Sequence, residues 1–469
     1  GGNLTLTSGN ASGIIDSGTV TVGGNLVATT DANSGVITLD NLAVDGTIAF
    51  TPHGSGNVTI VNDDGINFGA STMGGVFTMT ADSTVYDDGD SIKVSDDTTV
   101  TGTVVSTTGS TVFYTGSFRQ NINGGIFESG DTITDGTNTR TIAGSGVANG
   151  TLTATATTGN ITQSGALHIT GRSTFTTSEA DADITLQNTS NNFYDDVAFF
   201  TAGTTGNVAV YDSTNFYFAT STIRGNLAVE TANATNTAIG DGASAVLTVT
   251  GTTSLLASGE NNFKKLASII MNGSNHVFGG SVSAQGHHVR FSSDGAIELG
   301  NISSGWGVLG LTSTGAVTQS ETGYIQVAVD TTINAGSNNI TLDSTSNSFG
   351  GQSRSGTLAS GNIAAADEIK VTGANVVVAS DHSFNVGAST VSGNLTLTSG
   401  AAVNASGAYG ITDTDTVDVA GNFSATTNGN NGAIVMGTLE IDGTIALTTH
   451  GTGNATLDNG SLNIDLAAS

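Results

Sequence analysis

The feature that most constrains this chain is repetition. Residues 2–9, GNLTLTSG, return unchanged at 393–400, and the match extends from 2–68 to 393–467. Inside this long repeat, residues 160–193 match residues 316–349. One active site needs one set of residues, whereas stacked structural units repeat routinely. We therefore predict a repetitive structural chain, and we expect this sequence to be a window from a longer polypeptide.

Short segments of alternating apolar and polar residues recur along the whole sequence. Val36–Leu39, Val58–Val61 and Val76–Met79 are examples, each rich in β-branched residues and bounded by Gly, Asn, Asp or Ser. That pattern is typical of strands and turns. Because no segment carries a convincing 3.6-residue apolar stripe, the sequence predicts an all-β protein.

Gly-Asn pairs directly precede many of these segments. Gly and Asn tolerate the left-handed backbone geometry that a corner demands, and stacked Asn side chains can hydrogen-bond from one turn to the next. These pairs favour a parallel β-helix of about 20 residues per turn, forming one continuous β-solenoid over 1–469, a single elongated rod. The predicted ladder asparagines include Asn25, Asn57, Asn226, Asn394 and Asn422.

The composition excludes several classes of protein. The formal net charge of −29 comes from 39 acidic against 10 basic residues, and the basic residues are scattered. Nucleic acid and anionic lipid need clustered Lys and Arg, so we expect neither as a partner. With no cysteine there are no disulfides. No apolar run approaches the roughly 18 residues that span a bilayer.

Phenylalanines recur after Asn or Ser. They could form an aromatic track on which glycans stack, but the pattern favours an interior ladder of rings that supplies much of the core. The phenylalanines assigned to this ladder are Phe68, Phe193, Phe216, Phe263, Phe349 and Phe384.

Acidic clusters are the weak candidates for a calcium site. Calcium prefers several hard oxygens, which alternating Asp residues at a turn can offer. No known calcium-loop spacing is present, so solvated turn carboxylates are the favoured interpretation. We expect no cofactor, with calcium left open. The candidate residues are Asp87, Asp88, Asp90, Asp413 and Asp415.

The densest polar cluster is His287-His288 with Arg290. Adjacent residues on a strand point to opposite faces, so the two histidines cannot readily bind one metal ion there. A loop would relax that objection.

The runs 384–398 and 339–351, FNVGASTVSGNLTLT and NITLDSTSNSFGG, resemble the repeats of filamentous haemagglutinin-type exoproteins. Those are adhesins exported by two-partner secretion. The resemblance implies a right-handed parallel β-helix on a bacterial surface. The amino-terminal secretion domain of that family is not recognisable in this sequence.

We therefore predict a non-enzymatic fibre, stalk or adhesin shaft of a secreted bacterial surface protein. It would be extracellular, with self-association into fibres and host or cell-surface glycans as its partners. Two alternatives stay open, a β-helical polysaccharide lyase or tailspike-like hydrolase and a surface-layer lattice protein. The motifs of pectin-cleaving enzymes are absent, but carboxylates that face one sugar can arise on any Asp-lined solenoid.

Overall fold

The computed structural model describes most of the chain. The residues described are 2–32, 34–63, 65–73, 75–80, 91–94, 101–108, 111–115, 132–134, 139–141, 145–149, 151–232, 237–242, 244–258, 267–305, 307–350, 367–400, 409–428 and 431–469.

Alternation along each short segment produces strands with one buried and one outward face. In β4 (Leu26–Thr30), Leu26 and Ala28 are buried while Val27 between them is exposed. Successive side chains on a strand point to opposite sides, so the apolar set turns inward together. Every regular element in the described residues is a strand, and the all-β prediction is confirmed.

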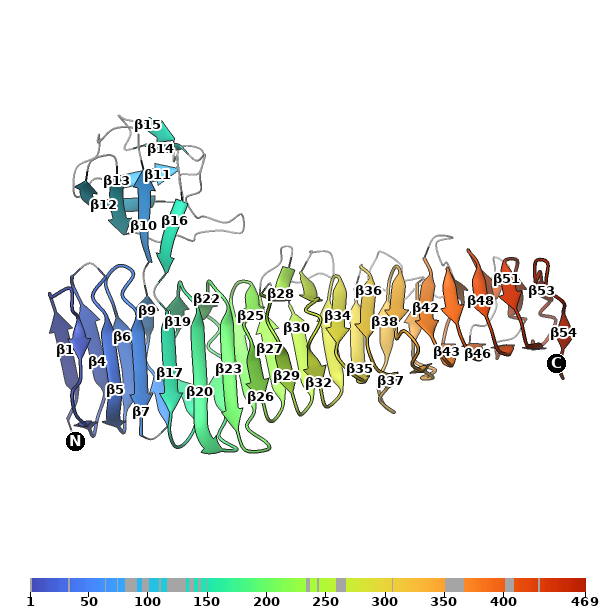
Figure 1. Ribbon diagram of the computed structural model, residues 1–469, viewed down its shortest axis with the longest axis horizontal. Helices are drawn as coiled ribbons and strands as arrows, with labels where there is room; N and C mark the ends of the chain where they lie inside the picture. Colours follow the sequence, from blue (N-terminus) through green and yellow to red (C-terminus); the bar gives the residue numbers. More distant parts are fainter. Residues whose placement is uncertain are drawn as a thin grey trace. The chain divides into compact units, whose positions relative to one another are not determined.

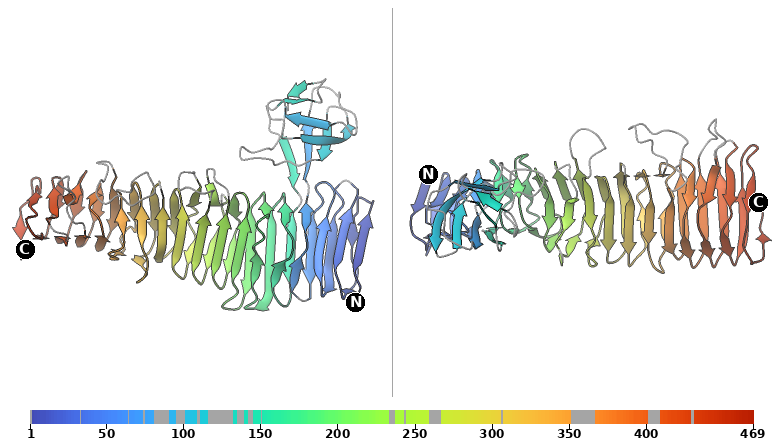
Figure 2. Two further views of the ribbon diagram at one scale, coloured as in Figure 1. Left: turned by 180° about the vertical axis from the view of Figure 1, so that it is seen from behind. Right: turned by 90° about the horizontal axis from the view of Figure 1, so that it is seen from above.

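The chain divides into two units, Gly1–Phe216 and Tyr217–Ser469. In both, the strands lie side by side (Figures 1 and 2). Unit 1 has a solenoid of parallel strands and an inserted antiparallel sheet. Besides β4, the strands of its solenoid are β1 (Leu4–Ser8), β2 (Ile14–Ile15), β3 (Val20–Val22), β5 (Ile37–Val44), β6 (Thr47–Thr51), β7 (Val58–Asn62), β8 (Ile66–Phe68), β9 (Ser71–Met73), β17 (Leu152–Ala156), β18 (Ile161–Gln163), β19 (Leu167–Ile169), β20 (Ser173–Ala180), β21 (Ile184–Leu186), β22 (Asn192–Phe193), β23 (Val197–Ala202) and β24 (Val208–Asp212), and β25 (Phe216–Phe218) begins at its last residue.

The strands of this solenoid pair in parallel with the strand one turn later. Leu4 of β1 faces Leu26 of β4, and Leu26 faces Ile48 of β6, so each of these turns takes 22 residues (26 − 4 and 48 − 26). Facing positions carry apolar residues in both strands, so similar side chains stack on one another in the interior. The predicted β-solenoid is confirmed, with turns slightly longer than the predicted length.

An antiparallel sheet interrupts the coils of unit 1. Its strands are β10 (Gly75–Thr80), β11 (Ser91–Val94), β12 (Thr101–Thr108), β13 (Thr111–Thr115), β14 (Thr132–Thr134), β15 (Thr139–Thr141) and β16 (Ser145–Asn149). Around it, β7 pairs directly with β17, β8 with β18 and β9 with β19. The sheet is thus inserted between two successive turns. The prediction of one continuous solenoid did not include this antiparallel sheet, because alternating β-branched residues look alike in parallel and antiparallel strands.

Unit 2 repeats the parallel arrangement. Val376, Leu395, Phe423 and Ile445 face one another in sequence on β43, β46, β49 and β52. The strands that lie wholly in this unit are β26 (Ser221–Ile223), β27 (Leu227–Thr231), β28 (Thr237–Asp241), β29 (Leu247–Val249), β30 (Thr253–Ala257), β31 (Ser268–Met271), β32 (Val277–Phe278), β33 (Val282–Gly286), β34 (Val289–Ser293), β35 (Ile297–Ser304), β36 (Leu309–Ser313), β37 (Val317–Gln319), β38 (Ile325–Val327), β39 (Thr331–Asn334), β40 (Ile340–Leu342), β41 (Ser348–Phe349), β42 (Ile369–Gly373), β43 (Val376–Ser380), β44 (Phe384–Val386), β45 (Ser389–Val391), β46 (Leu395–Ser399), β47 (Tyr409–Asp413), β48 (Val417–Val419), β49 (Phe423–Thr427), β50 (Ala433–Met436), β51 (Leu439–Ile441), β52 (Thr444–Thr448), β53 (Ala455–Leu457) and β54 (Asp465–Leu466).

Close packing between successive turns explains why glycine occupies the Gly-Asn corners. We predicted left-handed backbone there, and this is wrong for Gly24 and Gly421, because neither has a positive φ. The Gly421 N–H instead donates to the Gly393 carbonyl of the preceding turn (3.0 Å). A Cβ on Gly421 would lie 2.5 Å from that oxygen, closer than real Cβ atoms come. Left-handed φ occurs at other corners, including Ser34 (58°) and Asn431 (65°).

None of the described residues belongs to a helix with the length and hydrophobicity that crossing a membrane requires.

Candidate functional site

The predicted ladder asparagines lie at exposed corners, and each accepts a backbone hydrogen bond from the next turn. The Oδ1 of Asn25 accepts from the N–H of Thr47 at 2.9 Å, and the Oδ1 of Asn422 accepts from Thr444 at 2.9 Å. The other three do the same: Asn57 accepts from Thr151 (3.1 Å), Asn226 from Thr252 (2.8 Å) and Asn394 from Asn422 (2.8 Å). These amides join successive turns.

The ladder phenylalanines in the described residues point inward. In unit 1, Phe68 and Phe193 both contact Phe175 edge to face, with ring centroids 6.0 Å apart in each pair, and Phe193 contacts Phe216 at 6.5 Å. In unit 2, Phe349 contacts Phe384 at 6.4 Å. All five are at most 2% exposed, so none can stack on a glycan from outside. Phe263 lies outside the described residues.

The described calcium candidates are occupied by hydrogen bonds from the protein itself. Asp413 accepts from the N–H of Gly437 (2.7 Å) and from the N–H and hydroxyl of Thr438 (2.7 and 2.9 Å). In the matching repeat, Asp16 similarly accepts from two consecutive backbone N–H groups of the next turn. Asp415 accepts from the N–H of Thr416 (2.8 Å). These carboxylates are built into corners as acceptors.

Asp87, Asp88 and Asp90 lie outside the described residues. Within the described part of the chain, no group of three or more His, Asp or Glu side chains is arranged to hold a metal ion. The described residues therefore offer no support for a calcium site.

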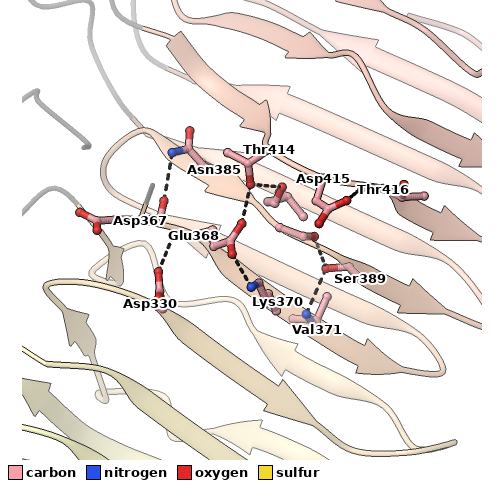
Figure 3. Close-up of polar contacts among 12 residues, drawn as sticks. Asp330, Asp367, Glu368, Lys370, Val371, Asn385, Ser389, Thr414, Asp415 and Thr416 are labelled. Atoms are coloured by element: carbon pink, nitrogen blue, oxygen red, sulfur yellow. Dashed lines mark hydrogen bonds and ion pairs between the residues drawn. The ribbon is translucent and has the colours of Figure 1, made fainter. Parts of the chain in front are cut away.

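Figure 3 shows the polar cluster beside β42, on unit 2. Glu368 forms an ion pair with Lys370 and accepts a hydrogen bond from the Thr414 hydroxyl at 2.5 Å. Its backbone N–H donates to Asp330 (3.3 Å). Burial works to raise the pKa of Glu368, but the hydrogen bonds from Lys370 and Thr414 outweigh it and leave that pKa below its ordinary value.

This cluster is a poor match to a glycosidase site. The acid in such a site needs a raised pKa, so that it holds a proton to give to the leaving group. Glu368 is instead held as a carboxylate by its donors.

The histidine pair lies in the bend between β33 and β34. The rings of His287 and His288 contact each other, with centroids 4.3 Å apart. The Nδ1 of His288 accepts from the N–H of Val308 at 3.1 Å, so that nitrogen is already used. Burial lowers the pKa of both histidines.

Sequence reasoning missed a set of buried polar corners. Asn191 and Gln163 exchange two side-chain hydrogen bonds of 2.8 Å, and the Asn191 Oδ1 also accepts from the N–H of Leu167 at 2.9 Å. The signal was present, because Gln163 and Asn191 each recur 156 residues later, as Gln319 and Asn347 (319 − 163 and 347 − 191).

The later pair has the same geometry, with reciprocal bonds of 2.7 and 2.9 Å between the amides and a 2.9 Å bond from the Ile325 N–H to the Asn347 Oδ1. Asn191 and Asn347 are both fully buried. Paired with glutamine, each satisfies a backbone donor in the interior that would otherwise have no partner.

Comparisons with known proteins identify one family. A family model described as repeats of unknown function (DUF5649) matches residues 55–117, 129–199, 205–285, 286–355 and 373–431. Searches of curated proteins and of solved structures found no match. The family matches cover well over half of the chain. The chain therefore belongs to the family of repeats of unknown function DUF5649.

Proposed function

We propose that the chain is a non-enzymatic structural segment of a large, repetitive, secreted bacterial surface protein, in which it acts as a fibre, stalk or adhesin shaft. The observation that carries this proposal is the register-matched stacking of turn on turn. A stacked solenoid gains stability from each neighbouring turn and can be lengthened by adding repeats.

The use of the polar side chains supports this role. Asparagines at the corners and buried amide pairs inside are hydrogen-bonded to neighbouring turns, as with Asn422 and Asn191. A binding or catalytic site normally presents polar groups that converge on an open cleft. Here the polar groups of the described corners hold the protein's own backbone instead.

The place of action rests on the resemblance of 384–398 and 339–351 to filamentous haemagglutinin-type repeats. From it we infer an extracellular location on a bacterial surface and export by two-partner secretion. The strongly acidic composition suits a long extracellular molecule, because like charges discourage lateral sticking.

Self-association end to end is part of the proposal, with host or cell-surface glycans as further partners. Parallel strand edges at the end of a solenoid can pair with another copy. Sedimentation velocity over a range of concentrations tests this association. A single species at every concentration would contradict it.

The two alternatives have less support. A polysaccharide lyase or hydrolase needs a carboxylic acid poised to donate a proton, and Glu368 has its pKa shifted the other way. A calcium-dependent surface-layer lattice needs free carboxylate oxygens, whereas Asp413 already accepts three hydrogen bonds from the next turn.

The proposed function is tested by labelling intact cells of the source organism with antibodies raised against the purified chain. We expect labelling of intact cells and its loss after mild external protease treatment. Labelling only after cell lysis would overturn the surface location. Release of soluble sugar from acidic polysaccharides by the pure chain would overturn the non-enzymatic role.

A further inference from the structure

One repeat carries a histidine where its two neighbours carry asparagine. The family repeats 129–199 and 286–355 contain the Gln163–Asn191 and Gln319–Asn347 pairs, and the repeat between them, 205–285, contains Asp241 and His276. Asp241 lies 78 residues after Gln163 and 78 before Gln319 (241 − 163 and 319 − 241). The aspartate takes the place of the glutamine.

The hydrogen bonds match those of the amide pairs. The Nδ1 of His276 accepts from the N–H of Leu247 at 3.0 Å, and its Nε2 lies 2.8 Å from the Oδ2 of Asp241. Leu247 begins β29 as Leu167 begins β19 and Ile325 begins β38. The N–H of Gly273 also donates to the Oδ2 of Asp241, at 2.5 Å.

These contacts permit one state of the imidazole. A backbone N–H can only donate, so Nδ1 of His276 must be without a proton, and Nε2 must carry the proton donated to Asp241. Both ring nitrogens are then used in hydrogen bonds. A second proton on Nδ1 would place one N–H against another, inside a corner where His276 is fully buried.

Among the residues that the structure describes, Asp241 is the charged side chain that forms an ion pair with His276. Asp241, at the end of β28, is the carboxylate in contact, and β29, β31 and β32 contain no charged residue. After β34, the Asp294 N–H donates to the His276 carbonyl at 2.6 Å, while its carboxylate accepts from the Thr314 hydroxyl. Arg290, on β34, is exposed.

We propose that the His276–Asp241 pair is a proton-sensitive latch, which holds the start of β29 when His276 is neutral and releases it when His276 takes up a proton. An imidazole can take up a second proton, whereas a side-chain amide does not titrate between about pH 5 and pH 8. The corners at Asn191 and Asn347 are therefore insensitive to protons in this range. This inference is independent of the proposed structural role.

Hydrogen exchange of the full chain tests the latch with internal controls. The amides of Leu247, Leu167 and Ile325 are compared at about pH 7.5 and about pH 5, after correction for the intrinsic effect of pH on exchange. We expect the protection of Leu247 to fall roughly tenfold at the lower pH, as loss of one buried hydrogen bond implies. The other two amides keep their protection. An equal response of all three amides would overturn the proposal.

The matched variant is D241Q/H276N, which copies the neighbouring amide pair. It should remove the pH response of Leu247 while leaving Leu167 and Ile325 unchanged. A response that persists in the variant would overturn the proposal. If the variant does not fold, ring nitrogen NMR of the wild-type chain decides. A His276 that carries its proton on Nδ1 near neutral pH, or that stays neutral throughout, would contradict the latch.

Discussion

Replacing Asn191 with alanine should be one of the most destabilising single changes in this chain. The Asn191 side chain accepts hydrogen bonds from the Leu167 N–H and from Gln163, and donates to Gln163 and to the Leu186 carbonyl (3.0 Å). Four such bonds at about 1 kcal/mol net each amount to about 4 kcal/mol. The loss also leaves the N–H of Leu167 buried without a partner, which adds to the cost.

The assay is the free energy of unfolding from guanidinium denaturation followed by circular dichroism. The matched control is Asn25→Ala. That asparagine is exposed and accepts one backbone bond from Thr47, which water can replace, so its removal should cost about 1 kcal/mol or less. Asn347→Ala should reproduce the large effect in unit 2, because the amide pair there has the same geometry. Equal losses for Asn191→Ala and Asn25→Ala would refute the argument that the buried amides lock the turns.

Three further outcomes are expected. Gly421→Ala should lower the free energy of unfolding by about 2 kcal/mol or more, because the new Cβ would collide with the Gly393 carbonyl. Gly437→Ala is the control and should be tolerated, because the nearest atom to a Cβ there is 3.9 Å away. Similar denaturation midpoints for the two variants would contradict this. Deleting residues 75–149 should leave a folded solenoid, because the turns on either side pair directly; loss of the cooperative β-sheet transition would count against it. Burial opposes the charged form of Asp241, but hydrogen bonds from His276 and Gly273 outweigh it, so its pKa lies below the ordinary 3.8. The ionised Asp241 therefore stabilises the folded state above about pH 4, and this contribution is lost as pH falls further. The difference in denaturation midpoint between the wild type and Asp241→Asn should shrink below that pH. A difference that stays constant with pH would refute this.

The strand boundaries show that deleting residues 75–149 leaves a connection of suitable length. It would leave residues 74, 150 and 151 between Met73 of β9 and Leu152 of β17. Residues 170–172 separate Ile169 of β19 from Ser173 of β20 in the next turn. The shortened chain therefore has the spacing that an uninterrupted turn uses.

The stacked strands could be predicted from the sequence because their signal is local and repeated. Alternation in segments such as 58–62 sets which side chains turn inward, and the long repeats indicate that similar turns stack. Asn25 and Asn422 were predictable as ladder residues because Gly-Asn stands before a strand each time.

Other features depend on contacts between turns that alternation does not encode. The role of Gly421 is set by the carbonyl of Gly393, one turn away, and not by its own backbone angles. The latch at His276 depends on an aspartate in the preceding turn, and a single histidine at that position carries no repeat signal. The antiparallel pairing of β10 to β16 could not be predicted, because both kinds of sheet use the same alternating pattern.

Both the fold and the proposed role rest on parallel turns stacked in one register, and a designed disulfide tests that register most directly. The chain has no cysteine, so Thr153→Cys with Thr174→Cys introduces the only pair. These residues face each other on β17 and β20, at the roughly 4.8 Å of stacked strands, within the range of about 4.4–6.8 Å that a disulfide spans. We expect rapid oxidation of this pair and slow oxidation of Thr153→Cys with Thr176→Cys, which are offset by two residues. Equal or reversed rates would contradict the stacked parallel register.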